Sequence, residues 1–415
     1  MELTERVILI GVQTDDCDVS QSLAELAELL QTAGAETVGT VIQNREAAHA
    51  GTYIGKGKIE EVRELIRETG ATGVVCDDEL SPAQMKNLEE QLDTKVMDRT
   101  VVILDIFASH AASREGKLQV ELAQHRYHLT RLAGYGKSMS RLGGGIGTRG
   151  PGETKLETDR RRIRQRISTL KAELKELVRQ RSVRRSRREK NAIPVAAIVG
   201  YTNAGKSTLL NALTGADVLS EDKLFATLDP TTRSCILPHG EKVLFTDTVG
   251  FIRKLPHHLI EAFRSTLEEA RFSDLIIHVA DVSDPDCQEH MTVVYDTLRA
   301  LDIGGKPVLT VFNKCDLIPE GRLPSDSRAE KVIRISAKTG EGLDELLLAV
   351  EDILRDGRMY MEHLYSYKDA GEIGIIRNAG QLLTEEYRED GVFVSAWVPK
   401  TLYRRLFLTG QQEDM

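Results

Sequence analysis

The chain has 415 residues, which is too long for one typical hydrophobic core and predicts two to four domains. Its 41% hydrophobic and 29% charged residues are ordinary for a soluble globular protein. We expect no membrane span, because the sequence has neither a signal peptide nor a run of about 18 apolar residues. Its five cysteines form no C-x-x-C pair, which argues against a disulfide framework or a zinc site, so we expect a cytoplasmic protein.

Residues 1–110 alternate strand-like runs with amphipathic ones, a rhythm typical of a small α/β domain with a largely parallel sheet. The expected strands are residues 6–11, 37–42, 73–76 and 95–97, and the expected helices are residues 20–33, 59–69 and 82–92. Gly55–Lys58 opens one helix, where backbone N–H groups could bind an anion such as a nucleotide phosphate. A basic turn explains the same residues equally well.

Residues 111–190 contain two helical patterns with apolar stripes of matching spacing, which predict an antiparallel coiled-coil hairpin. The first helix is expected over residues 115–133 and the second over residues 160–178. The stripe positions are Leu118, Leu122, His125, Leu129 and Leu132 in the first helix, and Ile163, Ile167, Leu170, Leu174 and Leu177 in the second.

Basic charge is concentrated in this hairpin. The net charge of −9 would ordinarily argue against a nucleic-acid partner, but Lys155–Lys190 has 15 Lys/Arg and 5 Asp/Glu, a balance of +10 that leaves −19 for the rest. Gly134–Gly152 has eight glycines in 19 residues, and we expect a loop that touches structured RNA. A linker beside a solvated charged helix is the alternative. The candidate RNA-binding residues are Lys137, Arg141, Arg149, Lys155, Arg160 and Arg161.

A phosphate-binding motif, G-x-x-x-x-G-K-[ST], opens the next domain, which we place at residues 191–355. It follows the apolar run Val195–Val199, so we expect a strand, a glycine-rich turn and a helix whose backbone N–H groups bind a β-phosphate. Lys206 would reach the β- and γ-phosphates, and Ser207 would hold magnesium. The loop residues are Gly200, Tyr201, Thr202, Asn203, Ala204, Gly205, Lys206 and Ser207.

An Asp-x-x-Gly motif follows the apolar run Val243–Phe245. A carboxylate at the end of this strand would face the phosphates, where a residue that binds magnesium through water is expected. The motif residues are Asp247, Thr248, Val249 and Gly250.

Two further motifs predict a guanine pocket. They follow the apolar runs Pro307–Phe312 and Val332–Ile335, and their residues are Asn313, Lys314, Cys315 and Asp316, then Ser336, Ala337 and Lys338. Guanine has donors at N1 and N2 that the Asp316 carboxylate can accept together, whereas adenine would leave this carboxylate unpaired. Four motifs in this order, each behind an expected strand, predict a domain that binds GTP and GDP.

The last residues, 356–415, are expected to form a small α/β domain with strands at Glu372–Ile376 and Gly391–Val398. The overall fold expected is therefore α/β. A P-loop GTPase domain is combined with an N-terminal α/β domain, a coiled-coil hairpin and this C-terminal domain.

The chain resembles the HflX family, in the Obg and HflX group of translation-associated GTPases, over nearly its whole length. Beyond the nucleotide motifs, the resemblance is carried by Asp98–Thr100, Asp105–Phe107, Glu115–Gln124, Gly143–Gly147, Arg149–Lys155 and Phe225–Asp229. It implies an N-terminal domain that engages the large ribosomal subunit and a helical linker that reaches toward ribosomal RNA. It also implies a role in separating or rescuing stalled ribosomes.

The resemblance also assigns the switch segment. Thr227 matches the threonine that meets magnesium and the γ-phosphate in similar GTPases, and the remaining nucleotide-binding positions of this segment are Phe225, Ala226, Leu228 and Asp229. Spacing alone would allow Thr231 or Thr232 instead. All three threonines lie in one segment that GTP would order and hydrolysis would release.

Two positions bear on the hydrolysis rate. Many GTPases have a glutamine after Asp-x-x-Gly that orients the attacking water, but this chain has Phe251, so we expect slow intrinsic hydrolysis. If Phe251 is an ordinary core residue, slow intrinsic hydrolysis is still expected. Asn203 matches a position that holds a monovalent cation in similar potassium-dependent GTPases, although turn chemistry explains an asparagine equally well. The candidate catalytic residues are Lys206, Thr227, Asn203 and Gly250, with Mg²⁺ as cofactor and K⁺ as a candidate additional cofactor.

The leading hypothesis is a monomeric GTP-hydrolysing switch, slow alone and activated by the large ribosomal subunit and its rRNA, that splits or rescues stalled ribosomes. A ribosome-assembly GTPase with immature subunits as partner would use the same chemistry. A third hypothesis is an RNA-binding or remodelling protein with a second nucleotide site near Lys56.

Overall fold

A computed structural model describes residues 5–14, 19–139, 151–189, 193–215, 224–225, 229–256, 259, 269–319, 324–356 and 358–407. The chain divides into two compact units. The first contains Met1–Lys175, Glu221–Asp229 and Ile252–Arg264, and the second contains Glu176–Ser220, Pro230–Phe251 and Ser265–Met415. Within the described residues, no helix is long and apolar enough to cross a membrane.

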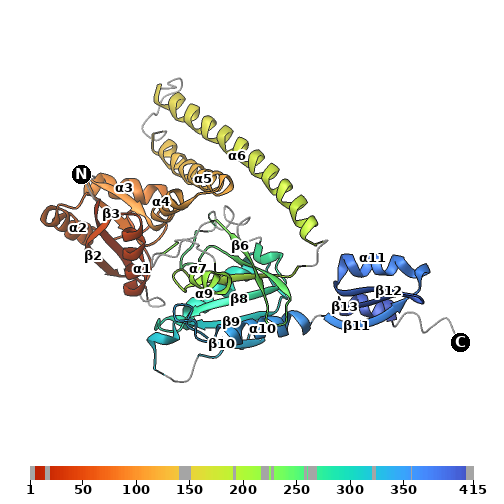
Figure 1. Cartoon of the computed structure of the whole chain (residues 1–415). Coiled ribbons are helices and arrows are strands. Elements are labelled where there is room, and N and C mark those ends of the chain that lie inside the picture. Colours follow the sequence, from red (N-terminus) through yellow and green to blue (C-terminus); the bar gives the residue numbers. More distant parts are fainter. Residues whose placement is uncertain are drawn as a thin grey trace. The chain divides into compact units, whose positions relative to one another are not determined.

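The first unit contains a four-stranded sheet with the strand order β2-β1-β3-β4, in which every pair is parallel. Its strands are β1 (Arg6–Gln13), β2 (Glu36–Asn44), β3 (Gly73–Cys76) and β4 (Lys95–Asp98). Helices α1 (Val19–Thr32), α2 (Lys56–Thr69), α3 (Pro82–Leu92) and α4 (Arg99–His110) accompany this sheet (Figure 1). The expected parallel α/β sheet is therefore confirmed.

Local signals explain where these elements begin. Ser81 and Gln84 form a reciprocal capping box ahead of α3, and Pro82 occupies its first turn. Gly55 precedes α2, as expected, but its N–H donates to Gln43 Oε1 at 2.7 Å. One donor of the candidate anion site therefore already has a partner.

The helical hairpin consists of α5 (Arg114–Met139) and α6 (Pro151–Glu189). Arg166 of α6 forms a two-point ion pair with Glu121 of α5, with nitrogen–oxygen distances of 2.7 and 2.9 Å. Arg114, at the start of α5, lies 3.7 Å from Glu173, further along α6. The two helices are thus antiparallel, as the matching apolar stripes predict.

The expected loop over Gly134–Gly152 is wrong at both ends, because α5 continues to Met139 and α6 begins at Pro151. A glycine inside a helix costs only about 1 kcal/mol, so an established helix can continue through isolated glycines. Proline suits the first helical position, where its missing N–H is not needed. Arg141 and Arg149 lie outside the described residues.

The second unit contains a six-stranded sheet in the order β10-β9-β8-β5-β7-β6, parallel except for the β6–β7 pair. Its strands are β5 (Val195–Gly200), β6 (Thr231–Ile236), β7 (Lys242–Asp247), β8 (Leu275–Asp281), β9 (Val308–Asn313) and β10 (Lys331–Arg334). Helices α7 (Lys206–Thr214), α9 (Cys287–Ala300) and α10 (Leu343–Asp356) accompany them. The sheet, α7 and α10 share a buried hydrophobic core.

The same unit ends in a three-stranded antiparallel sheet, β11 (Arg358–Tyr365), β13 (Gly391–Pro399) and β12 (Gln381–Arg388), with helices α11 (Ala370–Ala379) and α12 (Lys400–Phe407) (blue in Figure 1). The strand expected at Glu372–Ile376 is wrong, because these residues lie in α11. Ile373 and Ile376 are buried and Ile375 is 38% exposed. This three-residue spacing of buried side chains is helical.

Candidate nucleotide site

The phosphate-binding loop lies between β5 and α7, in the strand–turn–helix context that the motif requires. Asn203 and Gly205 have positive φ angles of 58° and 91°, which curl the backbone. A Cβ at Gly205 would lie 2.2 Å from Asn313 Nδ2, and one at Gly200 would lie 2.2 Å from the Val279 oxygen. Both glycines are therefore needed for the close approach of the loop to β8 and β9.

Lys206 begins α7 and is 7% exposed. Its Nζ donates to the Tyr201 carbonyl oxygen at 2.7 Å. Burial lowers the pKa of Lys206 to about 8, and the Asp247 carboxylate offsets part of that shift. A phosphate beside this amine would favour its charged form and raise the pKa again.

We expect nucleotide binding to take up a proton above pH 8. The depressed pKa leaves Lys206 about half neutral at pH 8 and mostly neutral at pH 9, and the phosphates require its charged form, so affinity should be full well below pH 8 and fall as the pH rises through that value. Calorimetry in buffers of different ionisation enthalpy should find uptake of about 0.1 proton per GDP at pH 7 and about 0.9 at pH 9. Proton uptake that stays the same at pH 7 and pH 9, or that persists in Lys206→Ala, would contradict the assignment of this proton to Lys206.

Ser207 and Asp247 form the candidate magnesium site. The Ser207 hydroxyl donates to Asp247 Oδ2 at 2.7 Å, and Asp247 is fully buried at the end of β7. Burial raises the pKa of this carboxyl, against the effects of Lys206 and Ser207. Its other oxygen, Oδ1, is buried without a hydrogen-bond partner among the described residues. A hydroxyl beside an unsatisfied carboxylate oxygen fits a hydrated Mg²⁺.

The Asp-x-x-Gly motif continues directly beside the phosphate-binding loop. The Phe251 N–H donates to the Gly200 oxygen at 3.1 Å, and the Thr202 N–H donates to the Phe251 oxygen at 2.8 Å. A Cβ at Gly250 would lie 3.0 Å from Lys206 Nζ. Gly250 therefore lies against the amine that would meet the γ-phosphate. The Phe251 side chain is only 1% exposed, as a core position for this ring predicts.

Asn313 joins the phosphate-binding loop to the base-binding motifs. Its Nδ2 donates to the Ala204 oxygen at 2.9 Å, and its Oδ1 accepts from the Ala337 N–H at 2.9 Å. Asp316 is exposed on a short 3₁₀ turn after β9. Ser336 is buried and accepts from the Thr339 N–H at 3.2 Å, whereas Lys338 is exposed.

Sequence reasoning missed two contributors. Lys314 Nζ pairs with Asp281 Oδ2 at 2.7 Å, so a carboxylate at the end of β8 orients this lysine. The apolar run Leu275–Ala280 ahead of Asp281 could have predicted its place. The ring of Tyr201 stacks on His290 of α9, with centroids 3.8 Å apart. No local pattern indicates that contact.

The candidate switch residues are only partly described. Ala226, Thr227 and Leu228 lie outside the described residues, whereas Phe225 and Asp229 belong to the first unit. Thr231 and Thr232, the alternatives to Thr227, lie in β6, and the Thr232 hydroxyl is 2.9 Å from that of Thr246. The choice of Thr227 stays a prediction.

The candidate RNA-binding residues lie on the hairpin where they are described. Lys137 is on α5, and Lys155, Arg160 and the exposed Arg161 are on α6. A cavity of about 520 Å³ in the hairpin is lined by His128, Arg131, Leu132, Asp159, Arg162 and Ile163.

Known protein families match three successive parts of the chain. Family models match residues 20–108 (GTP-binding GTPase N-terminal), 110–188 (GTP-binding GTPase middle region) and 195–314 (50S ribosome-binding GTPase). A GTPase HflX of Lacrimispora saccharolytica is 64% identical over 406 residues, which cover 98% of this chain and 96% of that protein. The chain belongs to the HflX family of GTPases.

Other HflX GTPases are similar over comparable lengths. Those of Caldanaerobacter subterraneus and Escherichia coli are 51% and 41% identical, each across 97% of this chain and 93% and 95% of their own lengths. The solved structure of SsGBP with GDP covers 85% of this chain and 99% of that chain, at 25% identity and a TM-score of 0.47. The HflX relatives confirm the predicted family and, with it, a P-loop enzyme that binds and hydrolyses GTP.

Proposed function

We propose that this HflX-family GTPase binds the large ribosomal subunit in its GTP form and splits or rescues stalled ribosomes. The observation that carries the proposal is the match of residues 195–314 to a 50S ribosome-binding GTPase. The segregated charge supports it, because Lys155–Lys190 is strongly basic in a chain whose net charge is −9.

In the proposed cycle, each nucleotide motif has its own role. The loop N–H groups and Lys206 hold the β- and γ-phosphates, and Asp316 accepts from the guanine N1 and N2 donors. Ser207 and Thr227 would hold Mg²⁺ directly, and Asp247 through water. When bound, this ion neutralises charge that develops on the phosphates. Gly250 contributes its backbone N–H beside the γ-phosphate.

Slow hydrolysis by the free protein follows from the same residues. Phe251 is buried and its ring offers no hydrogen bond to the attacking water. Asn203 lies in the curled loop, where a K⁺ ion held by its side chain would supply charge that an arginine finger supplies elsewhere. A ribosomal partner that completes the site would then trigger hydrolysis and release.

The basic hairpin is the proposed contact with ribosomal RNA. Exposed arginines on α6, including Arg161, Arg162 and Arg164, offer charge to phosphates. Such contacts release counterions, so we infer that binding weakens steeply with salt.

The test is GTP turnover with and without purified large ribosomal subunits. Because the Phe251 ring cannot orient the attacking water, we expect subunits to raise the rate at least about 1,000-fold, the lower end of the range that a charged group added in trans supplies. Lys206→Ala is the negative control. Equal rates with and without subunits would contradict the proposal.

A further inference from the structure

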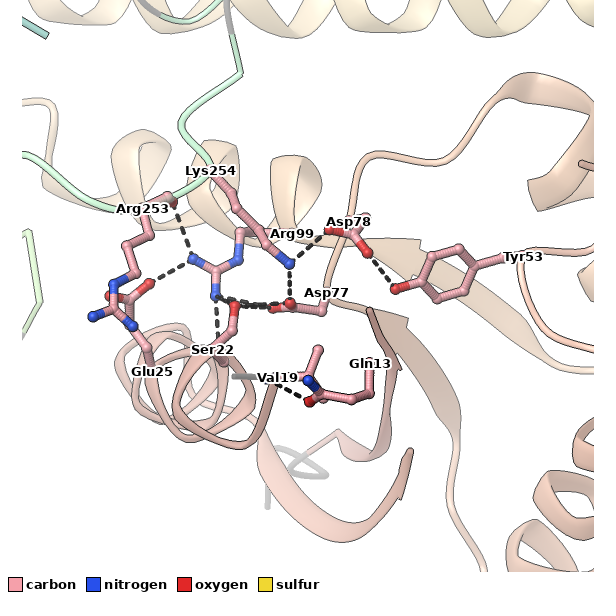
Figure 2. A network of polar contacts seen from close by, with 10 residues as sticks. All are labelled: Gln13, Val19, Ser22, Glu25, Tyr53, Asp77, Asp78, Arg99, Arg253 and Lys254. Atoms are coloured by element: carbon pink, nitrogen blue, oxygen red, sulfur yellow. Dashed lines mark hydrogen bonds and ion pairs between the residues drawn. The ribbon is translucent and has the colours of Figure 1, made fainter. Parts of the chain in front are cut away.

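A buried ionic cluster lies at the carboxyl ends of the strands in the first unit (Figure 2). Asp77 follows β3 and is fully buried, and Arg99, which follows β4, is 1% exposed. Arg99 Nη2 lies 3.0 Å from Asp77 Oδ1 and donates to the Ser22 carbonyl oxygen at 2.8 Å. Its Nη1 pairs with Glu25 at 2.5 Å. The charged side chains of this cluster are thus buried and held by specific contacts, rather than solvated.

Lys254, from a distant part of the sequence, contacts this cluster. Its Nζ pairs with Asp77 Oδ2 and lies 2.7 Å from Asp78 Oδ1 (Figure 2). Tyr53 holds Asp78 from the other side, with its hydroxyl 2.6 Å from Oδ2. The carbonyl oxygen of Arg253 accepts from Arg99 Nη1 at 3.1 Å, so both main chain and side chain of this segment are held.

The surrounding charges favour the ionised forms of both Asp77 and Lys254. Burial raises the pKa of Asp77, but Arg99 and Lys254 outweigh that effect and hold it below its usual value. Partial burial lowers the pKa of Lys254, but the two carboxylates outweigh it and raise the pKa. Lys254 also has φ of 53°, a conformation that a residue with a Cβ adopts only where its surroundings enforce it.

The segment that the cluster holds, Arg253 and Lys254, closely follows the Asp-x-x-Gly motif. Gly250 precedes Lys254 by four residues and lies beside Lys206 Nζ, where a γ-phosphate would come. Phe251 belongs to the second unit and Ile252 to the first, so the chain passes between the units at this peptide bond. An anchored Lys254 therefore limits the freedom of the peptide that GTP, but not GDP, must engage.

The other γ-phosphate segment is anchored in the same unit. Asp229 Oδ2 accepts from the N–H groups of Ala112 and Ser113 at 3.0 and 2.7 Å, just before α5, and its Oδ1 accepts from the Ser113 hydroxyl. Ahead of it, Phe225 packs edge-on against Phe107 of α4, with centroids 4.7 Å apart. The residues on both sides of Thr227 are thus fixed in the first unit.

We propose that Lys254 and Asp229 are positioning residues for GTP, which act by anchoring the two γ-phosphate segments in the first unit. An anchored segment has less conformational freedom to lose when the γ-phosphate orders it. By linkage, GTP strengthens both anchors and so reports nucleotide state to the sheet and to the start of α5. The inference rests on the nucleotide site proposed above and does not depend on the ribosome.

The test compares the affinities of a non-hydrolysable GTP analogue and of GDP by calorimetry, without ribosomes. We expect Lys254→Met to weaken the GTP analogue about tenfold, a factor typical of coupling between sites, and to leave GDP unchanged. Lys254→Arg should restore most of the loss, because it keeps the charge. Ser113→Ala, which removes one bond to Asp229, should give the same selective loss to a smaller extent. Lys95→Met, which removes an exposed pair with Glu5 in the same unit, is the matched control.

Equal effects of Lys254→Met on both nucleotides, no effect on either, failure of arginine to restore affinity, or the same loss in Lys95→Met would each overturn the proposal. The wild-type protein tests the underlying site separately. If it binds neither nucleotide, the guanine site itself is wrong, whereas a wild-type protein that binds both leaves the anchors to be judged by the variants alone.

Discussion

Replacement of Asp316 by asparagine is expected to change the preferred base from guanine to xanthine. The carboxylate can accept from the N1 and N2 donors of guanine together, whereas an amide offers one acceptor and one donor. Xanthine has a carbonyl oxygen at C2 in place of the amino group, so it matches the amide. The amide can accept from only one of the two guanine donors, without the carboxylate charge, and its NH₂ faces the other donor, so the substitution should weaken GTP binding about 1,000-fold.

Competition among GTP, XTP and ATP for the Asp316→Asn variant measures this change. Asp296→Asn, an exposed carboxylate paired with Arg299 on α9, is the matched control and should keep the wild-type preference. Unchanged GTP affinity in Asp316→Asn would mean that the base does not bind at this turn.

The second large effect concerns ribosomes. In GTP, the protein is expected to convert ribosomes into free subunits and to remain with the large one, because GTP favours the state that binds the subunit. If the binding-competent state rises from about 1% to about 99% of the protein, the subunit must bind that state about 10⁴-fold more tightly than the other state. High salt should reverse the binding, since phosphate contacts of the basic hairpin carry it.

The parts of the fold that local patterns determine could be predicted from the sequence. The bounds expected for β3 and α3 agree with the structure, because clear turn and capping residues flank both. The phosphate-binding loop, Asp247 and the guanine motifs each lie at or just beyond the carboxyl end of a strand, as the apolar runs ahead of them predict. These signals work because each motif and its strand are neighbours in the chain.

Short apolar runs were less informative. Glu372–Ile376 alternates like a strand, but the contacts of Ile373 and Ile376 make it part of α11. A five-residue pattern fits both periods, and tertiary packing decides between them.

Contacts between distant residues were not predictable. Lys254 and Asp77 are 177 residues apart, and neither lies in a pattern that indicates the other. The bond from Asp229 to Ser113 spans 116 residues in the same way. Only the folded chain shows that Phe225 and Asp229, on the two sides of Thr227, and Lys254, after Gly250, are held in the first unit.

The most direct test of the proposed function is sedimentation of ribosomes with the protein in GTP, in GDP and in a non-hydrolysable GTP analogue, scored for subunit separation. We predict free subunits with GTP and with the analogue, protein retained on the large subunit with the analogue, and intact ribosomes with GDP. A protein that sediments only with immature subunits would instead be an assembly factor. Intact ribosomes in all three nucleotides would contradict the account.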